Sequence, residues 1–104
     1  MAENVTVPAP LRVLRLAETL FRSVVDGMSN KELVAATGYS PTNVCRDLQL
    51  LQSAGWVRQL ENGRWTLTEK PAALMKVYQL HMSDLVERSR TFDMRATATA
   101  SQML

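Results

Sequence analysis

Three polar side chains lie close together near the middle of the chain, namely Asn43, Arg46 and Gln49. An arginine can form two parallel hydrogen bonds with the edge of a guanine, and asparagine or glutamine can do the same with an adenine. In a helix, Arg46 and Gln49 would share one face with Thr42, and Asn43 would lie on the flank of that face. These residue types at this spacing suit the reading of base edges in a major groove.

Two short helices joined by a tight turn would hold these side chains in place. Ser29 can cap the first helix, and Glu32 can return a hydrogen bond to the backbone of Ser29 in a capping box. Gly38 is expected to end that helix, and Ser40 with Pro41 to begin the next one. The sequence therefore predicts a helical hairpin with a sharp turn.

The second of these helices is expected to cover residues 41–54 and to bury Val44, Leu48 and Leu51, which recur at helical spacing. Its opposite side would stay exposed and rich in hydrogen-bond donors. The alternative is that this polar side is only the solvated face of a small helical bundle, because short motif matches carry false positives.

A β-hairpin is predicted directly after the helices, over residues 56–68. Asn62 and Gly63 stand between two runs of strand-forming residues, which is a strong signal for a two-residue turn. With Arg64, they form a tip at which the backbone can approach phosphates. The hairpin is therefore a candidate wing, and the alternative is that it only covers the core.

The predicted turn also sets the pairing of the two strands. Leu60 would face Trp65, and Glu61 would face Arg64 across the turn. One side of the hairpin would then be apolar, with Val57 as the apolar exception on the other side. The residues expected on the apolar side are Trp56, Leu60, Trp65 and Leu67.

An amphipathic helix is expected upstream, over residues 11–27. Apolar residues recur there at helical spacing, and arginines 12, 15 and 22 take the more exposed positions. Met28 is expected to form a brief strand against the hairpin. The apolar residues of this helix are Leu11, Leu14, Leu20, Phe21, Val24 and Val25.

The predicted order over residues 11–68 is helix, helix, turn, helix and two-stranded wing, which is a winged helix-turn-helix, mainly α with a small β-hairpin. From Leu16 to Thr68 the chain resembles the DNA-binding domain of IclR-type transcription regulators. That resemblance implies a DNA-binding regulator, and a free-standing domain of this kind would suit a phage or other mobile element as well as a bacterial host. It is carried by Glu32, Leu33, Thr37, Gly38, Thr42, Val44, Arg46, Leu48, Leu51, Gly55 and Val57.

The chain departs from the IclR pattern in two respects. Asp47 stands where the family usually has an apolar residue, and a carboxylate near phosphates is unfavourable unless it faces away or accepts from a cytosine amino group. The large ligand-sensing domain of full-length IclR regulators is not expected here, so control by a small-molecule effector cannot be carried over.

The segments outside this domain are expected to be simpler. Residues 1–10 would form a flexible arm, and residues 69–90 a helix with two apolar stripes. One stripe would dock on the core and the surplus would support a homodimer that reads paired half-sites, unless all of it packs within one chain. The tail, residues 91–104, could fray, extend the helix or dock on a partner.

Composition limits the classes of function. The chain has 104 residues, a net charge of only +2 and a single cysteine, Cys45. It suits one domain in a reducing cytoplasm, associated with the nucleoid, with no membrane span. Glycine-rich phosphate loops and metal-binding spacings are missing, and His81 is the only histidine, so neither catalysis nor a cofactor or metal is expected.

Two functions remain. The first is a sequence-specific DNA-binding transcriptional regulator, in which the residue 41–54 helix enters the major groove and the wing contacts the adjacent backbone or minor groove. The second is a winged helix used as a protein-binding adaptor or antirepressor, which the low net charge, Asp47 and the surplus apolar surface favour. The residues predicted to bind double-stranded DNA are Ser40, Thr42, Asn43, Arg46, Gln49, Lys31, Asn62 and Arg64.

Overall fold

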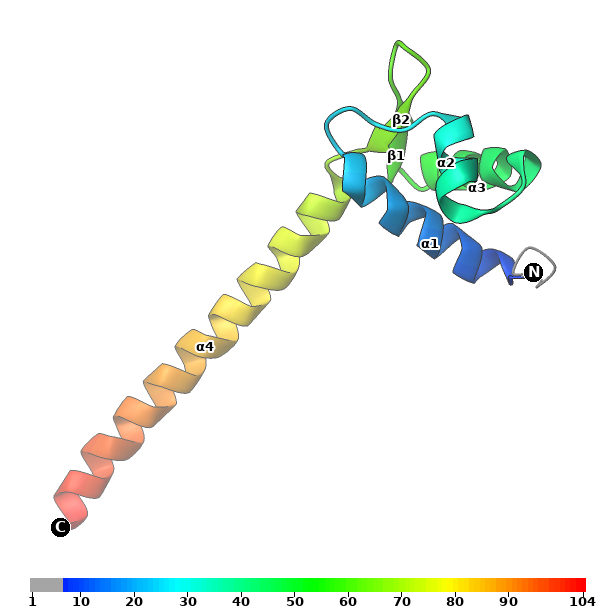
Figure 1. Ribbon diagram of the computed structural model, residues 1–104. Helices are drawn as coiled ribbons and strands as arrows, with labels where there is room; N and C mark the ends of the chain where they lie inside the picture. The colour runs from blue at the N-terminus through cyan, green and yellow to red at the C-terminus, as the bar shows by residue number, and fades with distance from the viewer. Residues whose placement is uncertain (1–6) are drawn as a thin grey trace. The chain divides into compact units, whose positions relative to one another are not determined.

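The computed structural model describes residues 7–104, and its contacts divide the chain into two units that meet between Pro71 and Ala72. The first unit contains three α-helices and a two-stranded antiparallel hairpin, and the second is the body of one long helix (Figure 1). This is the predicted winged helix-turn-helix with a C-terminal helix. The elements are α1 (Ala9–Leu20), the 3-10 turn η2 (Phe21–Ser23), α2 (Asn30–Thr37), α3 (Pro41–Ser53), β1 (Val57–Gln59), β2 (Trp65–Leu67) and α4 (Lys70–Met103).

The ends of α2 and α3 follow the predicted capping. The N–H of Glu32 donates to the hydroxyl of Ser29 at 3.1 Å, and the N–H of Ser29 donates back to the Glu32 carboxylate at 2.9 Å. α2 ends at Gly38, and the hydroxyl of Ser40 accepts from the N–H of Asn43 at 3.1 Å to cap α3. Each cap satisfies a backbone donor that the helix itself leaves unpaired.

The core of the first unit lies between α1, α2, α3 and the hairpin. Helix α3 buries Val44, Leu48 and Leu51, as predicted. The remaining buried apolar residues come from α1, α2, β1 and β2, whereas η2 buries none. They are Leu16, Ala17, Leu20, Leu33, Val57, Trp65 and Leu67.

Helix α1 differs from the prediction in its length and in its buried face. It ends at Leu20, and η2 with the turn after it connects the helix to Met28. Its buried side consists of Leu16, Ala17 and Leu20, and only Leu20 belongs to the predicted apolar stripe. When a helix has two apolar stripes, its sequence does not show which of them packs against the core. Of the apolar residues whose spacing predicted this helix, Leu20 is buried and the others are exposed, namely Leu11, Leu14, Phe21, Val24 and Val25.

The register of the hairpin is one residue away from the prediction. Val57 pairs with Leu67 and Gln59 pairs with Trp65, so the loop at the tip has three residues, 61–63. The N–H of Gly63 donates to the carbonyl of Leu60 at 2.9 Å, and the φ of Gly63 is 85°. This is a turn followed by a left-handed glycine, the usual three-residue alternative to a two-residue loop.

The shift changes which side chains share a face. Val57 joins Trp65 and Leu67 in the core, whereas Trp56 and Leu60, predicted on that face, are only half-buried. Glu61 lies in the loop and does not face Arg64, whose carbonyl accepts from the N–H of Leu60 at 2.7 Å. A slip of one residue moves every side chain of a strand to the opposite face.

Met28 forms the predicted brief strand beside the hairpin. Its N–H donates to the carbonyl of Trp65, and the N–H of Trp65 donates back to Met28, both at 2.8 Å. The preceding residue must be glycine, because a Cβ on Gly27 would lie 2.7 Å from the carbonyl oxygen of Trp65. The hairpin is therefore held by the turn that leads into α2.

Helix α4 is continuous over Lys70–Met103 and buries none of its residues. It runs beyond residue 90, so of the three alternatives for the tail, residues 91–104, the structure has the extended helix. Pro71 lies in its first turn, where its missing N–H costs no hydrogen bond. Within residues 7–104, every helix is too short or too polar to cross a bilayer. The predicted arm, residues 1–10, falls mostly outside the described residues.

Candidate nucleic-acid interface

The outer face of α3 presents polar side chains to solvent. Thr42, Arg46 and Gln49 are exposed and Asn43 is half-buried, as the sequence predicted. The side chain of Arg46 forms no hydrogen bond or ion pair with any residue from 7 to 104. The amide of Gln49 has one weak contact, 3.8 Å from the sulfur of Cys45. Both long side chains therefore keep their hydrogen-bonding groups for a partner.

The one carboxylate of α3, Asp47, is fully buried on the opposite side of the helix. Arg12 of α1 donates to it twice, from Nε to Oδ2 at 2.6 Å and from Nη2 to Oδ1 at 2.9 Å. The hydrogen bond to Asp47 raises the pKa of Arg12 above its ordinary value. Arg12 was predicted to be exposed, yet only 15% of its side chain is, because it closes this two-pronged pair.

This ion pair shows where the carboxylate of Asp47 points, which the sequence alone left open. The carboxylate faces away from the polar side of α3 and is neutralised by a guanidinium. It therefore adds no negative charge to the polar face of α3. The same two hydrogen bonds tie α3 to α1, so the pair also sets how the polar face is held.

The N-terminus of α3 offers donors to an anion. Pro41 has no N–H and the N–H of Asn43 is satisfied by the cap, which leaves the N–H of Thr42 as a helix donor without an intrahelical acceptor. The oxygen of Ser40 accepts in the cap, but its hydrogen remains free to donate. Exposed Lys31 lies in the first turn of α2. Hydrogen-bond donors at a helix N-terminus, with a nearby cation, are the kind of groups that can hold a phosphate.

The wing tip carries Asn62, which is exposed and whose side-chain oxygen accepts from the N–H of Arg64 at 3.0 Å. Arg64 itself points back to the domain. Its guanidinium lies 2.7 Å from the Glu32 carboxylate and donates to the carbonyl of Gly27 at 2.9 Å and to that of Asp26 at 3.1 Å. Arg64 therefore fixes the hairpin against the start of α2.

Glu32 joins the cap of α2 to the wing. The hydrogen bond from the backbone of Ser29, with the nearby charge of Arg64, holds the pKa of Glu32 below its ordinary value. The carboxylate stays ionised over a wider pH range, which keeps both of its partners in place.

Two further exposed residues accompany the predicted DNA-binding residues, and they were not identified from the sequence. Arg58 on β1 pairs with Thr66 and is exposed, so it is a cation of the wing without the contacts that hold Arg64. Leu50 on α3 is 58% exposed, next to Gln49 and one helical turn after Arg46. An apolar side chain at that place can contact a thymine methyl group. In the sequence, its exposure could have been predicted from the helical spacing, because Leu50 does not lie on the buried stripe of Val44 and Leu48.

The part of the chain from residue 7 to the end contains no group of three or more histidine, cysteine, aspartate or glutamate side chains that could hold a metal ion.

The three helices and the hairpin define a winged helix-turn-helix domain. Residues 11–61 match the family model of the IclR helix-turn-helix domain, a stretch that contains most of α1, all of α2 and α3, and β1. This domain belongs to the IclR helix-turn-helix family, which indicates a DNA-binding transcription regulator. No curated protein is significantly similar to the chain.

Proposed function

We propose that this protein is a sequence-specific DNA-binding transcription regulator that inserts α3 into the major groove. One observation carries the proposal: α3 keeps Arg46 and Gln49 exposed on one face while its only carboxylate, Asp47, is buried against Arg12. A face with amide and guanidinium groups and no negative charge suits both base edges and phosphates.

The residues of α3 divide into two roles. Arg46, Gln49 and Asn43 read base edges, Arg46 with a preference for guanine and the two amides for adenine. Ser40 and Thr42, with the helix N-terminus, hold a phosphate and set the register of the helix on the duplex. Lys31 adds a backbone contact from the start of α2.

The wing contacts the adjacent backbone or minor groove. Asn62 at the tip and Arg58 on β1 supply its side chains, since both are exposed. Arg64 holds the hairpin that carries these two residues, because its guanidinium is already bound to Glu32 and to two backbone carbonyls. In this proposal Arg64 is a positioning residue for the wing and not its main phosphate contact.

A second function, a protein-binding adaptor or antirepressor in the cytoplasm, has one observation in its favour. Large apolar side chains of α1 and of the turn after it are exposed, among them Leu14, Phe21 and Val25. The carboxylate of Asp47 no longer supports this alternative, because it is buried.

The regulator is proposed to act as a dimer joined through α4. Two copies would read two half-sites of one operator and double the number of phosphate contacts. A small net charge, +2 over the whole chain, makes that doubling useful, because each copy alone would bind DNA weakly at physiological salt.

The proposal is tested by selecting bound fragments from random or genomic DNA with the purified protein and with Arg46→Ala. Arg46→Ala should weaken binding to the selected site by about 1–3 kcal/mol and relax the base preference at one position. Arg90→Ala is the matched control, since it removes the same charge from α4 and should leave the selected sequence unchanged. Failure of the protein to enrich any fragment at low salt would favour the adaptor function.

A further inference from the structure

A seven-residue repeat runs along α4 from Met75 to Met103. Residues that alternate three and four apart are apolar over this stretch, with Ser89 and Thr99 as the exceptions. This is the spacing at which two helices pair in a left-handed coiled coil. We call this set the α4 seam, and it consists of Met75, Tyr78, Met82, Leu85, Ser89, Phe92, Ala96, Thr99 and Met103.

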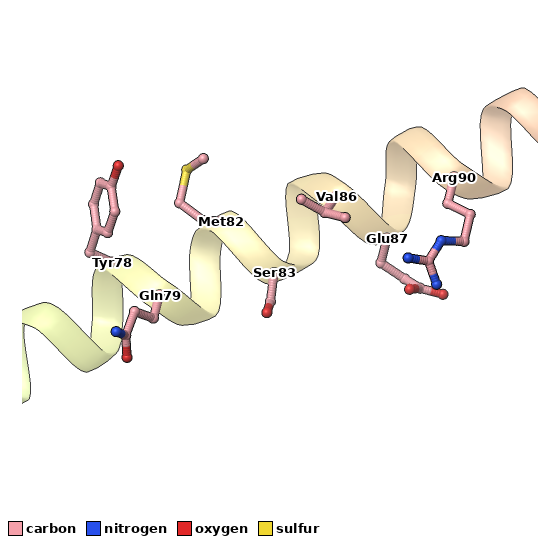
Figure 2. Close-up of a pocket in the computed structure, with 7 residues that line it drawn as sticks. All are labelled: Tyr78, Gln79, Met82, Ser83, Val86, Glu87 and Arg90. Atoms are coloured by element: carbon pink, nitrogen blue, oxygen red, sulfur yellow. The ribbon is translucent and has the colours of Figure 1, made fainter.

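The large apolar residues of the α4 seam are all exposed. Figure 2 shows Tyr78 and Met82 on one side of the helix, followed by Val86, which flanks the seam. Phe92 is 74% exposed and Leu85 58%. An exposed apolar stripe of this length is larger than a protein surface normally leaves in water, so it indicates a partner.

The helix also has little local support of its own. The one ion pair that α4 forms with residues 7–104, between Arg88 and Asp84 at 3.0 Å, joins two exposed side chains and stabilises the helix little. Residues 96–100 alternate alanine with threonine, and threonine is a poor helix former. Most helices of this kind owe their stability to packing of the apolar face.

We propose that two copies of this chain pair through the α4 seam as a parallel, in-register coiled coil. The inference deepens the proposed function and rests on it for its biological meaning, since the coil would be what joins the two DNA-binding units. A second copy fits the seam because the charged residues beside it are complementary to those of an identical helix.

The charged residues beside the seam select the parallel orientation. Arg88 and Asp93 flank Ser89 and Phe92 at the two positions that face across a parallel coil, so Arg88 lies beside the partner's Asp93 and the same pair forms again on the other side. In an antiparallel pair Arg88 would instead meet the partner's Arg88 or the partner's His81. Only the parallel pair brings opposite charges together.

The connection to the DNA-binding unit favours the same orientation. Each copy of α4 begins next to Pro71, where the first unit ends. A parallel coil brings the two copies of Pro71 to one end, whereas an antiparallel coil of a helix this long separates them by roughly 50 Å at 1.5 Å per residue. Half-sites one DNA turn apart need the former.

Sedimentation equilibrium of the full chain without DNA tests the pairing. The wild-type protein is expected to be a dimer at micromolar concentration, and Leu85→Lys in the seam should raise its dissociation constant at least 100-fold. Leu80→Lys is the matched control, because Leu80 is 69% exposed but lies on the outer side of the repeat. A monomeric wild type, or equal effects of the two substitutions, would overturn the proposal.

Charge exchange tests the register. Arg88→Glu and Asp93→Arg should each weaken the homodimer, and an equimolar mixture of the two variants should restore dimerisation as a heterodimer. No restoration would contradict the parallel register.

Disulfide trapping tests the orientation in the Cys45→Ser background. Met75→Cys near the start of the seam should cross-link two chains under mild oxidation, while Lys76→Cys, one residue outside it, should not. Because disulfides need Cα atoms within about 7 Å, an antiparallel coil would give no Met75→Cys cross-link, and that result would refute the parallel pair. These experiments contain no DNA, so the coil can fail while the DNA-binding proposal stands, and the reverse.

Discussion

The buried ion pair between Arg12 and Asp47 gives the sharpest prediction about this domain. Arg12→Ala removes both hydrogen bonds to a carboxylate that is fully buried, and no other side-chain partner of Asp47 is found among residues 7–104. The substitution therefore leaves a buried negative charge without compensation.

The size of the effect follows from that loss. Removing one partner of a buried ion pair typically costs about 3–5 kcal/mol. We expect the lower part of this range, because 15% of the Arg12 side chain is exposed and water can partly replace it. A loss of about 3 kcal/mol is a large share of the roughly 5–15 kcal/mol that stabilise a typical domain.

Urea unfolding followed by circular dichroism measures this loss. With a slope of about 1–2 kcal/mol per molar urea, Arg12→Ala should lower the unfolding midpoint by roughly 2 M. Arg15→Ala, an exposed arginine of the same helix, is the control and should change stability by less than about 0.5 kcal/mol.

The double variant Arg12→Leu with Asp47→Leu separates the cost of an unpaired charge from the loss of packing. Replacing both partners by apolar side chains is often neutral or stabilising, so the double variant should recover most of the stability that Arg12→Ala loses. If Arg12→Ala is as stable as the Arg15→Ala control, the ion pair does not have the role assigned to it here.

Three further predictions concern the turn, the cap and the wing. Gly27→Ala should destabilise the domain more than Gly38→Ala: both residues have positive φ, but only at Gly27 would the new Cβ lie 2.7 Å from a backbone oxygen, and thermal unfolding compares them. Glu32→Gln should flatten the fall of stability at acid pH. A carboxylate whose pKa is lowered by folding stabilises the protein above its unfolded pKa and loses that contribution as the pH falls through the folded pKa. The unfolding midpoint measured against pH checks this, with Glu61→Gln as the control. Arg58→Ala should weaken binding to all DNA sequences alike and reduce the slope of log K against log salt by about 1, and an unchanged slope would remove Arg58 from the interface.

Local chemistry was enough to predict the helices around the turn. The caps at Ser29 and Ser40 depend on residues within three positions of each other, so they could be predicted without knowledge of the rest of the fold. The same holds for the buried stripe of α3, and hence for the exposure of Arg46 and Gln49 on the opposite side. A helix's own periodicity fixes which residues are opposite to one another.

The tertiary structure decided the features that depend on distant residues. The carboxylate of Asp47 is neutralised only because Arg12, 35 residues away, is placed to bind it. In the same way, Arg64 is held by partners 32 to 38 residues earlier in the chain. The hairpin register is another such feature, since Val57 enters the core only when the loop has three residues.

What the sequence by itself determined is thus the order of the elements, their caps and the polar face of α3, because hydrogen bonds and periodicity over a few residues specify them. Which stripe of α1 meets the core, which strand face is buried and which arginines remain free were decided by packing between elements. For each of these features, alternative faces of one element compete to pack against the same neighbouring elements. The face that is buried is decided only when those elements come together in the folded chain.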